Sequence, residues 1–207
     1  MKKIMILALP VILLACTNET EKVKSEKADP HAGHRMGNDV ESDYADDVNT
    51  GRIKPDTMKG SPHRVAMATV GGTHVHIEYS SPGVKGRTIW GGLVAWDQVW
   101  VAGAHQATSV RFYKDVSIDN THIPAGTYAI FAIPGQREWT LILNSRYDQH
   151  LVDDYNPAED LVRVKLKPEE HSMMERLTYR VEPVSGDSGT IDLMWEKLKL
   201  SLPFKIL

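Results

Sequence analysis

The fold class of this chain is decided by one stretch, Thr73-His74-Val75-His76-Ile77-Glu78-Tyr79-Ser80. Val75, Ile77 and Tyr79 alternate with polar residues, and this period of two is typical of a β-strand with one buried face. Another β-prone run covers residues 64–70, and Gly71-Gly72 separates the two runs. Two glycines between such runs favour a tight hairpin turn. The stretch therefore predicts two antiparallel strands that share a core.

Similar runs continue to the C-terminus, at residues 109–113, 116–118, 126–133, 138–143, 161–166, 175–181, 190–195 and 197–204. Turn-forming residues such as Pro134-Gly135 separate them. Many short strands at this spacing are typical of all-β domains. We therefore predict an antiparallel β-sandwich of jelly-roll or immunoglobulin-like type, with at most a short helix near residues 151–159.

The composition excludes several classes of protein. The 207 residues contain 24 Lys and Arg, 27 Asp and Glu, and a single cysteine. One cysteine permits neither an intrachain disulfide nor a zinc site built on several thiolates. A slightly acidic chain also lacks the basic excess that nucleic-acid binding requires, so we expect no nucleic-acid partner.

Residues 1–15 have the pattern of an export signal. Lys2 and Lys3 precede a short apolar run that ends at Ala15, and the chain's only cysteine, Cys16, follows. The segment Leu13-Leu14-Ala15-Cys16 is similar to a bacterial lipobox, which predicts a lipoprotein signal peptide and acylation of Cys16, for example by palmitate. Several acyl chains together give a stable membrane anchor. We expect a lipid-anchored protein of the cell envelope, most simply in the outer membrane facing the periplasm, with surface exposure left open.

The segment that follows the anchor is polar. Before residue 61 it contains one aromatic residue, Tyr44, and all five Trp residues lie after position 60. Such a composition buries too little apolar surface to offset the loss of chain entropy. We therefore predict that residues 16–60 are the lipidated Cys and a flexible, disordered tether, and that residues 61–207 form the β-sandwich domain.

Several short motifs in the same order make the chain similar to a known family. They are Tyr79-Ser80-Ser81-Pro82, Lys85-Gly86-Arg87, Gly92-Leu93-Val94, Trp100, Gly103-Ala104, Ala107-Thr108, Pro124-Ala125-Gly126-Thr127-Tyr128, Ile133-Pro134 and Trp139-Thr140. In these residues the chain resembles DUF2911, a family of bacterial envelope lipoproteins and secreted proteins. The resemblance implies a β-sandwich envelope domain and no assigned activity.

The loop-rich stretch 81–108 is the first candidate for contact with a ligand. It contains Arg87, Trp100, His105 and Thr108 among several glycines, and cationic and aromatic side chains in loops suit recognition of sugars, peptides or anions. An envelope protein or a glycan would be a fitting partner. The alternative, which we favour, is structural: Trp side chains pin long loops to a sandwich, and Arg87 either pairs with a carboxylate or satisfies loop carbonyls.

Histidines suggest a second hypothesis, in which no cofactor is required but copper or zinc is bound. His74 and His76 share one strand face, and His105 or His122 could supply a third ligand. Separately, His31, His34 and Met36 lie within six residues of the tether, and imidazole with a thioether suits copper. The alternative interpretations are polar surface and solvated linker.

Catalysis has little support in the sequence, so whether the protein is an enzyme stays open, with binding preferred. The chain has no catalytic cysteine, no Gly-x-Ser-x-Gly motif and no phosphate-binding glycine loop. Ser80, Ser81, His105 and Asp97 are close in sequence, but only geometry identifies a catalytic triad. We expect a membrane-anchored binding or assembly module that uses residues 81–108. The alternatives are a copper- or zinc-handling lipoprotein and an unrecognised glycan or peptide hydrolase.

Overall fold

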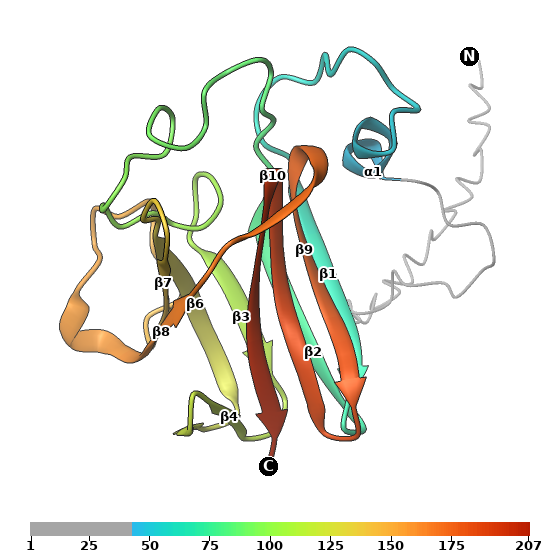
Figure 1. Cartoon of the computed structure of the whole chain (residues 1–207). Helices are drawn as coiled ribbons and strands as arrows, with labels where there is room; N and C mark the ends of the chain where they lie inside the picture. Colours follow the sequence, from blue (N-terminus) through green and yellow to red (C-terminus); the bar gives the residue numbers. More distant parts are fainter. Residues whose placement is uncertain (1–42) are drawn as a thin grey trace, which may run out of the picture. The chain divides into compact units, whose positions relative to one another are not determined.

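The structure, a computed structural model, describes residues 43–207, and nearly all of its regular elements are strands (Figure 1). One sheet has six strands in the order β1-β2-β3-β6-β7-β8, which are His63–Val70, Thr73–Ser80, Thr108–Phe112, Gly126–Ile133, Trp139–Asn144 and Asp160–Leu166. The other has four strands in the order β5-β4-β10-β9, which are Thr121–Ile123, Val116–Ile118, Ser188–Ile206 and Glu169–Ser185. Every pairing of these strands is antiparallel, which confirms the predicted sandwich.

Helices are few in this part of the chain. They are α1 (Tyr44–Asn49) and a 3-10 helix, η1 (Pro157–Glu159), which is the only helical turn in the region predicted to be helical near residues 151–159. Within residues 43–207, neither helix has the length and apolar character that a bilayer crossing would require.

The hairpin predicted at Gly71-Gly72 is confirmed. Val70 pairs with Thr73 across a two-residue turn, and the two glycines have φ values of 56° and 71°. A two-residue turn with positive φ at both positions matches the twist of antiparallel strands, and glycine adopts it without strain. This turn fixes the register that sends Val75 and Ile77 into the core.

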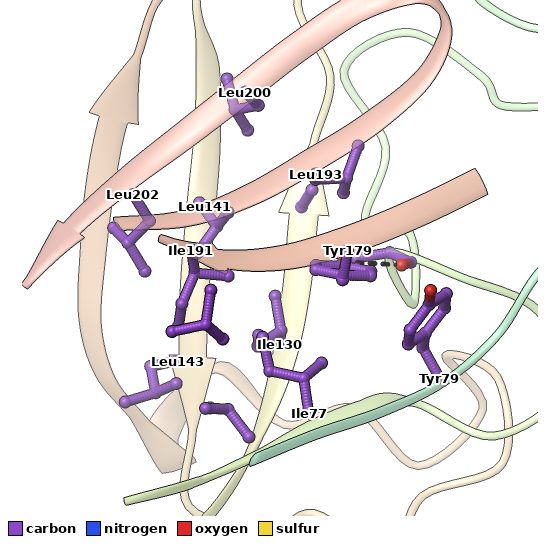
Figure 2. Packing of buried hydrophobic residues seen from close by; sticks show 14 of the residues in the cluster. Ile77, Tyr79, Ile130, Leu141, Leu143, Tyr179, Ile191, Leu193, Leu200 and Leu202 are labelled. Atoms are coloured by element: carbon purple, nitrogen blue, oxygen red, sulfur yellow. Dashed lines mark hydrogen bonds between the residues drawn. The ribbon is translucent and has the colours of Figure 1, made fainter. Parts of the chain in front are cut away.

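The core lies between the two sheets (Figure 2). Ile77 and Ile130 come from the six-stranded sheet, whereas Tyr179, Ile191 and Leu193 come from the four-stranded sheet, and all are buried. Burial of one such side chain contributes roughly 1.5–3 kcal/mol. Both sheets therefore depend on each other for their apolar faces.

Tryptophans connect the long loop after β2 to this core. The Trp90 ring lies 5.9, 4.7 and 5.6 Å from the rings of Trp100, Trp139 and Trp195, measured between centroids. Trp139 belongs to β7 and Trp195 to β10, whereas the other two belong to the loop. Edge-to-face pairs add to the apolar burial. The loop 81–107 is therefore held against the sandwich, as the structural interpretation of its Trp residues expects.

The ordered body begins earlier than the sequence predicts. Residues 43–60, which we call the strap, were assigned to the flexible tether, but α1 lies against β9 and the remainder of the strap also has defined contacts (Figure 1). Only a few apolar strap side chains, such as Ala45 and Val48, are buried. Its order comes largely from carboxylates that pair with buried arginines, as described below. Residues 1–42 lie outside the described part of the chain.

Candidate functional site

A cavity lies where the strap meets the loop after β2 and the first half of β9. Its volume is about 830 Å³, within the range that is common for small-molecule sites. The strap supplies one wall, residues 85 and 86 supply another, and Met173 and Glu175 of β9 supply a third. We call it the strap cavity.

Arg176 of β9 holds the strap in place. Its Nε lies 2.7 Å from Asp56 Oδ2, and its terminal nitrogens donate to Asp56 Oδ1 and to the carbonyls of Met58, Gly60 and Ser81. The side chain of Arg176 is 0% exposed and that of Asp56 is 2% exposed. A guanidinium has five N–H donors in a rigid fork; here both terminal nitrogens donate hydrogen bonds, and Nε lies at ion-pair distance from Asp56. Arg176 therefore joins three segments of the chain.

A second buried arginine binds the start of the strap. Arg64 of β1 pairs with Asp43 at 2.7 Å and with Asp46 at 2.8 Å, and donates to the hydroxyl of Thr178 at 3.2 Å. Asp43 also caps α1, because its side chain accepts from the backbone N–H of Ala45. The acidic strap is thus the counter-charge of two arginines on the sandwich.

The loop after β2 docks on the same part of β9. The backbone N–H of Val84 donates to the carbonyl of Glu175 at 2.7 Å, and that of Leu177 donates to the carbonyl of Pro82 at 3.0 Å. The backbone N–H of Lys85 donates to the Glu175 carboxylate at 2.6 Å, and Lys85 has φ 48°. Positive φ is uncommon for a residue other than glycine. These contacts fix Lys85 at the edge of the cavity.

Asp56 is the titrating group of this arrangement. Burial acts to raise the pKa of its carboxyl, but hydrogen bonds from Arg176 and Tyr44 and the positive charges of Arg176 and Lys85 act in the opposite direction. The net effect lowers the pKa of Asp56 below its ordinary value. The carboxylate therefore stays ionised at neutral pH and keeps its pair with Arg176.

The residues predicted to contact a ligand are spread over the loop and the first position of β3. Arg87 donates to the carbonyls of Val84 and Gly83, and Trp100 Nε1 donates to the carbonyl of Gly103 at 3.0 Å. Thr108 is 0% exposed, and its hydroxyl donates to the carbonyl of Ala102. His105 is exposed, with φ 63°. None of the four lines the strap cavity, whereas their neighbours Lys85 and Gly86 do. Ligand contact by these four residues stays a prediction.

The predicted metal ligands of the described part are not gathered around one point. His74 and His76 both lie on β2; His74 contacts Thr69 and Tyr113, and His76 lies 3.4 Å from Glu78. Among residues 43–207, no group of three or more His, Cys, Asp or Glu is placed to hold a metal ion. His31, His34, Met36 and the lipidation site Cys16 lie outside the described residues.

No triad assembles from the serines that the sequence suggested. Ser81 is fully buried and its hydroxyl donates to the carbonyl of Leu177 at 2.7 Å, so it faces β9. His122, the other histidine considered, lies on β5 and pairs with Asp115 at 2.8 Å. The hydroxyl of Ser81 is therefore bonded to a backbone carbonyl and not to a histidine.

The family of this protein can be assigned from the region that forms the sandwich. The family model described as "Protein of unknown function (DUF2911)" matches residues 61–204. The chain belongs to the DUF2911 family. No curated protein and no solved structure matches the chain. The match starts after the strap, so the DUF2911 region supplies Arg176 and Lys85 of the site, whereas Asp56 comes from the segment that precedes it.

Sequence reasoning missed Arg176 and the whole strap. Arg176 lies within a predicted strand, where an arginine is normally assigned to the solvent face. One signal was present: Asp43, Asp46, Asp47 and Asp56 form an acidic series directly before a sandwich that contains arginines. Such a series does not reveal which arginine is buried, so the partners emerge only from the fold.

Replacing Asp56 with Asn should destabilise the protein by roughly 3–5 kcal/mol at neutral pH, because Arg176 would stay buried without its counter-charge. The contribution of Asp56 is present above the pKa of an unfolded Asp, about 3.9, and is lost as the pH falls through the lower pKa of the folded chain. Urea unfolding of the wild type and the variant should therefore give curves that differ at neutral pH and converge under acid. A difference that stays constant with pH would contradict the role of the Asp56 charge.

Replacing Gly83 with Ala should disturb the same pair, because a Cβ at this position would lie 2.6 Å from Asp56 Oδ2 and 3.3 Å from Arg176 Nε. We expect a loss of about 1–3 kcal/mol in the free energy of unfolding. The control is the double variant Gly83→Ala/Asp56→Ala, in which the clashing carboxylate is absent. The double variant should lose less free energy of unfolding than the sum of the losses of Gly83→Ala and Asp56→Ala. Strictly additive losses would show that the effect of Gly83→Ala does not depend on Asp56.

Proposed function

We propose that this DUF2911 protein is a lipid-anchored lipoprotein of the cell envelope whose sandwich is a binding module, with the strap cavity as its binding site. The anchor rests on the sequence of residues 1–16, in which a short apolar signal ends at the chain's only cysteine. Lipidation at Cys16 would hold the domain at a membrane surface, most simply the outer membrane on its periplasmic side.

The single observation that carries the binding role is the strap cavity itself. It has the volume of a ligand site, about 830 Å³, and it combines apolar side chains with a few charged ones, as binding pockets do. Lys85 and Gly86 bring to it the 81–108 stretch, from which the sequence predicts ligand contacts. A loop held on a rigid scaffold is a common position for binding residues.

The proposed site is pre-formed by buried interactions. The strap is fixed by Arg176 and Arg64, and the loop is fixed by its backbone bonds to Glu175 and Leu177. A ligand would therefore meet walls that need little ordering, which reduces the entropy lost on binding. This rigidity favours binding over a role as a passive spacer.

Replacing Cys16 with Ser should abolish the anchor. In cells fed labelled palmitate, the wild type should carry label and sediment with membranes, and Cys16→Ser should carry no label because a hydroxyl does not replace the acylated thiol. Thr17→Ser is the matched control and should behave like the wild type. Label retained in Cys16→Ser would refute lipidation at this residue.

Replacing Met173 with Trp should fill the strap cavity without changing the core, because Met173 is 43% exposed and lines the cavity. The protein for this test begins at Thr17 and so contains the whole compact unit Glu41–Leu207. Ligand-observed ¹⁹F NMR with a fragment library of mixed charge should find fragments that bind the wild type and lose affinity at least about ten-fold in the variant.

Val184→Trp is the control for this experiment. Val184 lies on the same strand, is 65% exposed and is not part of the cavity lining. Fragment binding should be unchanged in this variant. If the library contains no fragment whose binding depends on residue 173, the strap cavity is not a ligand site.

A further inference from the structure

The acidic residues around the strap cavity have close partners, whereas the two lysines that line it have no ion pair within residues 43–207. Asp56 is neutralised by Arg176, and the Glu175 carboxylate accepts from the backbone N–H of Lys85. Lys54 and Lys85 also line the cavity, and among residues 43–207 neither has a carboxylate within ion-pair distance. The Lys85 ammonium donates to the carbonyl of Met58, which leaves further N–H donors. Within residues 43–207, both ammonium groups therefore keep N–H donors for an anion, although the charge of Lys85 also acts on Asp56.

Hydrocarbon side chains make up much of the remaining lining, beside the polar residues Asn49 and Thr50. Val48, Ile53, Pro55 and Met173 contribute hydrocarbon side chains, and the methylene stems of the lysines extend this surface. Among the described residues that line the cavity, none is aromatic. Sugars and nucleobases are usually held by stacking on aromatic rings, so this lining favours neither. It suits an aliphatic body, whose burial contributes about 0.8 kcal/mol per methylene.

We propose that the ligand of the strap cavity is an amphipathic anion, with a carboxylate or phosphate head bound by Lys54 and Lys85 and an aliphatic tail against Val48, Ile53 and Met173. This inference rests on the proposed function, because it names the ligand class of that site. The inference predicts that the ligand head is negative. A cationic head of the same size would be repelled by the ammonium groups of Lys54 and Lys85.

Glu175 has a limiting role in this arrangement. Its carboxylate fixes the backbone of Lys85 at 2.6 Å, so it orients one of the two cationic groups, but its charge also repels an anionic head. Substitution by Gln keeps an acceptor oxygen for that N–H and removes the charge. A role in charge recognition therefore predicts tighter anion binding in Glu175→Gln, whereas a purely structural role predicts little change.

The probes are decanoate and decyl phosphate, with decyltrimethylammonium and acetate as comparisons, each titrated below its micelle concentration and followed by calorimetry. The protein is the chain from Thr17. We expect saturable binding of one or both anionic probes, at least about ten-fold weaker binding of the cationic probe and no binding of acetate, which lacks a tail. The two anionic probes separate a fatty-acid-like head from a phospholipid-like head.

The variants test the residues directly. Lys54→Met/Lys85→Met keeps the apolar stems and removes both charges, so the dissociation constant of the anionic probe should rise at least about ten-fold. Lys85→Arg should retain most of the affinity, and Glu175→Gln should tighten binding several-fold. The matched control is Lys114→Met, an exposed lysine between β3 and β4. It should leave binding unchanged.

The outcomes separate this inference from the proposed function. Equal affinity for anionic and cationic probes, or no effect of the double lysine variant, would overturn the ligand class. If neither anionic probe binds while fragments in the Met173→Trp experiment do, the cavity is a binding site for another class and only this inference falls. If no fragment and no probe binds, both fall together.

Discussion

The pair of Arg176 and Asp56 is the interaction on which the arrangement of this molecule depends. A guanidinium with no exposed surface must be neutralised and hydrogen-bonded, because a buried unpaired charge is strongly unfavourable. The strap supplies the carboxylate and two carbonyls, and the loop after β2 supplies another. One side chain on β9 therefore determines where two segments lie that have little apolar surface of their own.

The cavity follows from that constraint. The strap is drawn to the edge of the sandwich by charge, whereas close packing of apolar side chains would have filled the space between the elements. Its aliphatic side chains and those of β9 are left facing a space of about 830 Å³. The arginines are fully engaged by strap carboxylates, so the positive charge that remains accessible belongs to lysines. The proposed ligand class is a consequence of this division between arginines paired with strap carboxylates and cavity lysines that have no ion-pair partner within residues 43–207.

Much of the fold could be predicted from the sequence, because it depends on patterns that are local. The alternation of Val75, Ile77 and Tyr79 specifies a buried strand face, and Gly71-Gly72 specifies the turn before it. The strap could not be predicted in this way, since its order comes from partners on the sandwich, as in the contact of Asp56 with Arg176, 120 residues further along the chain. A long-range ion pair produces no periodic pattern in the sequence. A count of aromatic and apolar residues therefore underestimates how ordered the strap is. The sequence therefore predicts only part of the candidate site. Residues 81–108 contribute Lys85 and Gly86, but the other walls come from the strap, which the composition predicts to be a tether, and from β9.

In the sequence, the strap lies between the predicted lipid anchor and the sandwich. On its N-terminal side lies Cys16, the predicted anchor, and on its C-terminal side lies β1. The strap also forms one wall of the proposed site. It would therefore connect the membrane anchor to the binding cavity. Asp43 and Asp46 hold the beginning of the strap on Arg64, and Asp56 holds its end on Arg176. Because the strap is fixed at both ends, a force applied through the proposed anchor would meet the ion pairs of Arg64 before it reached the cavity. This double attachment would preserve the shape of the proposed site in a protein anchored through Cys16.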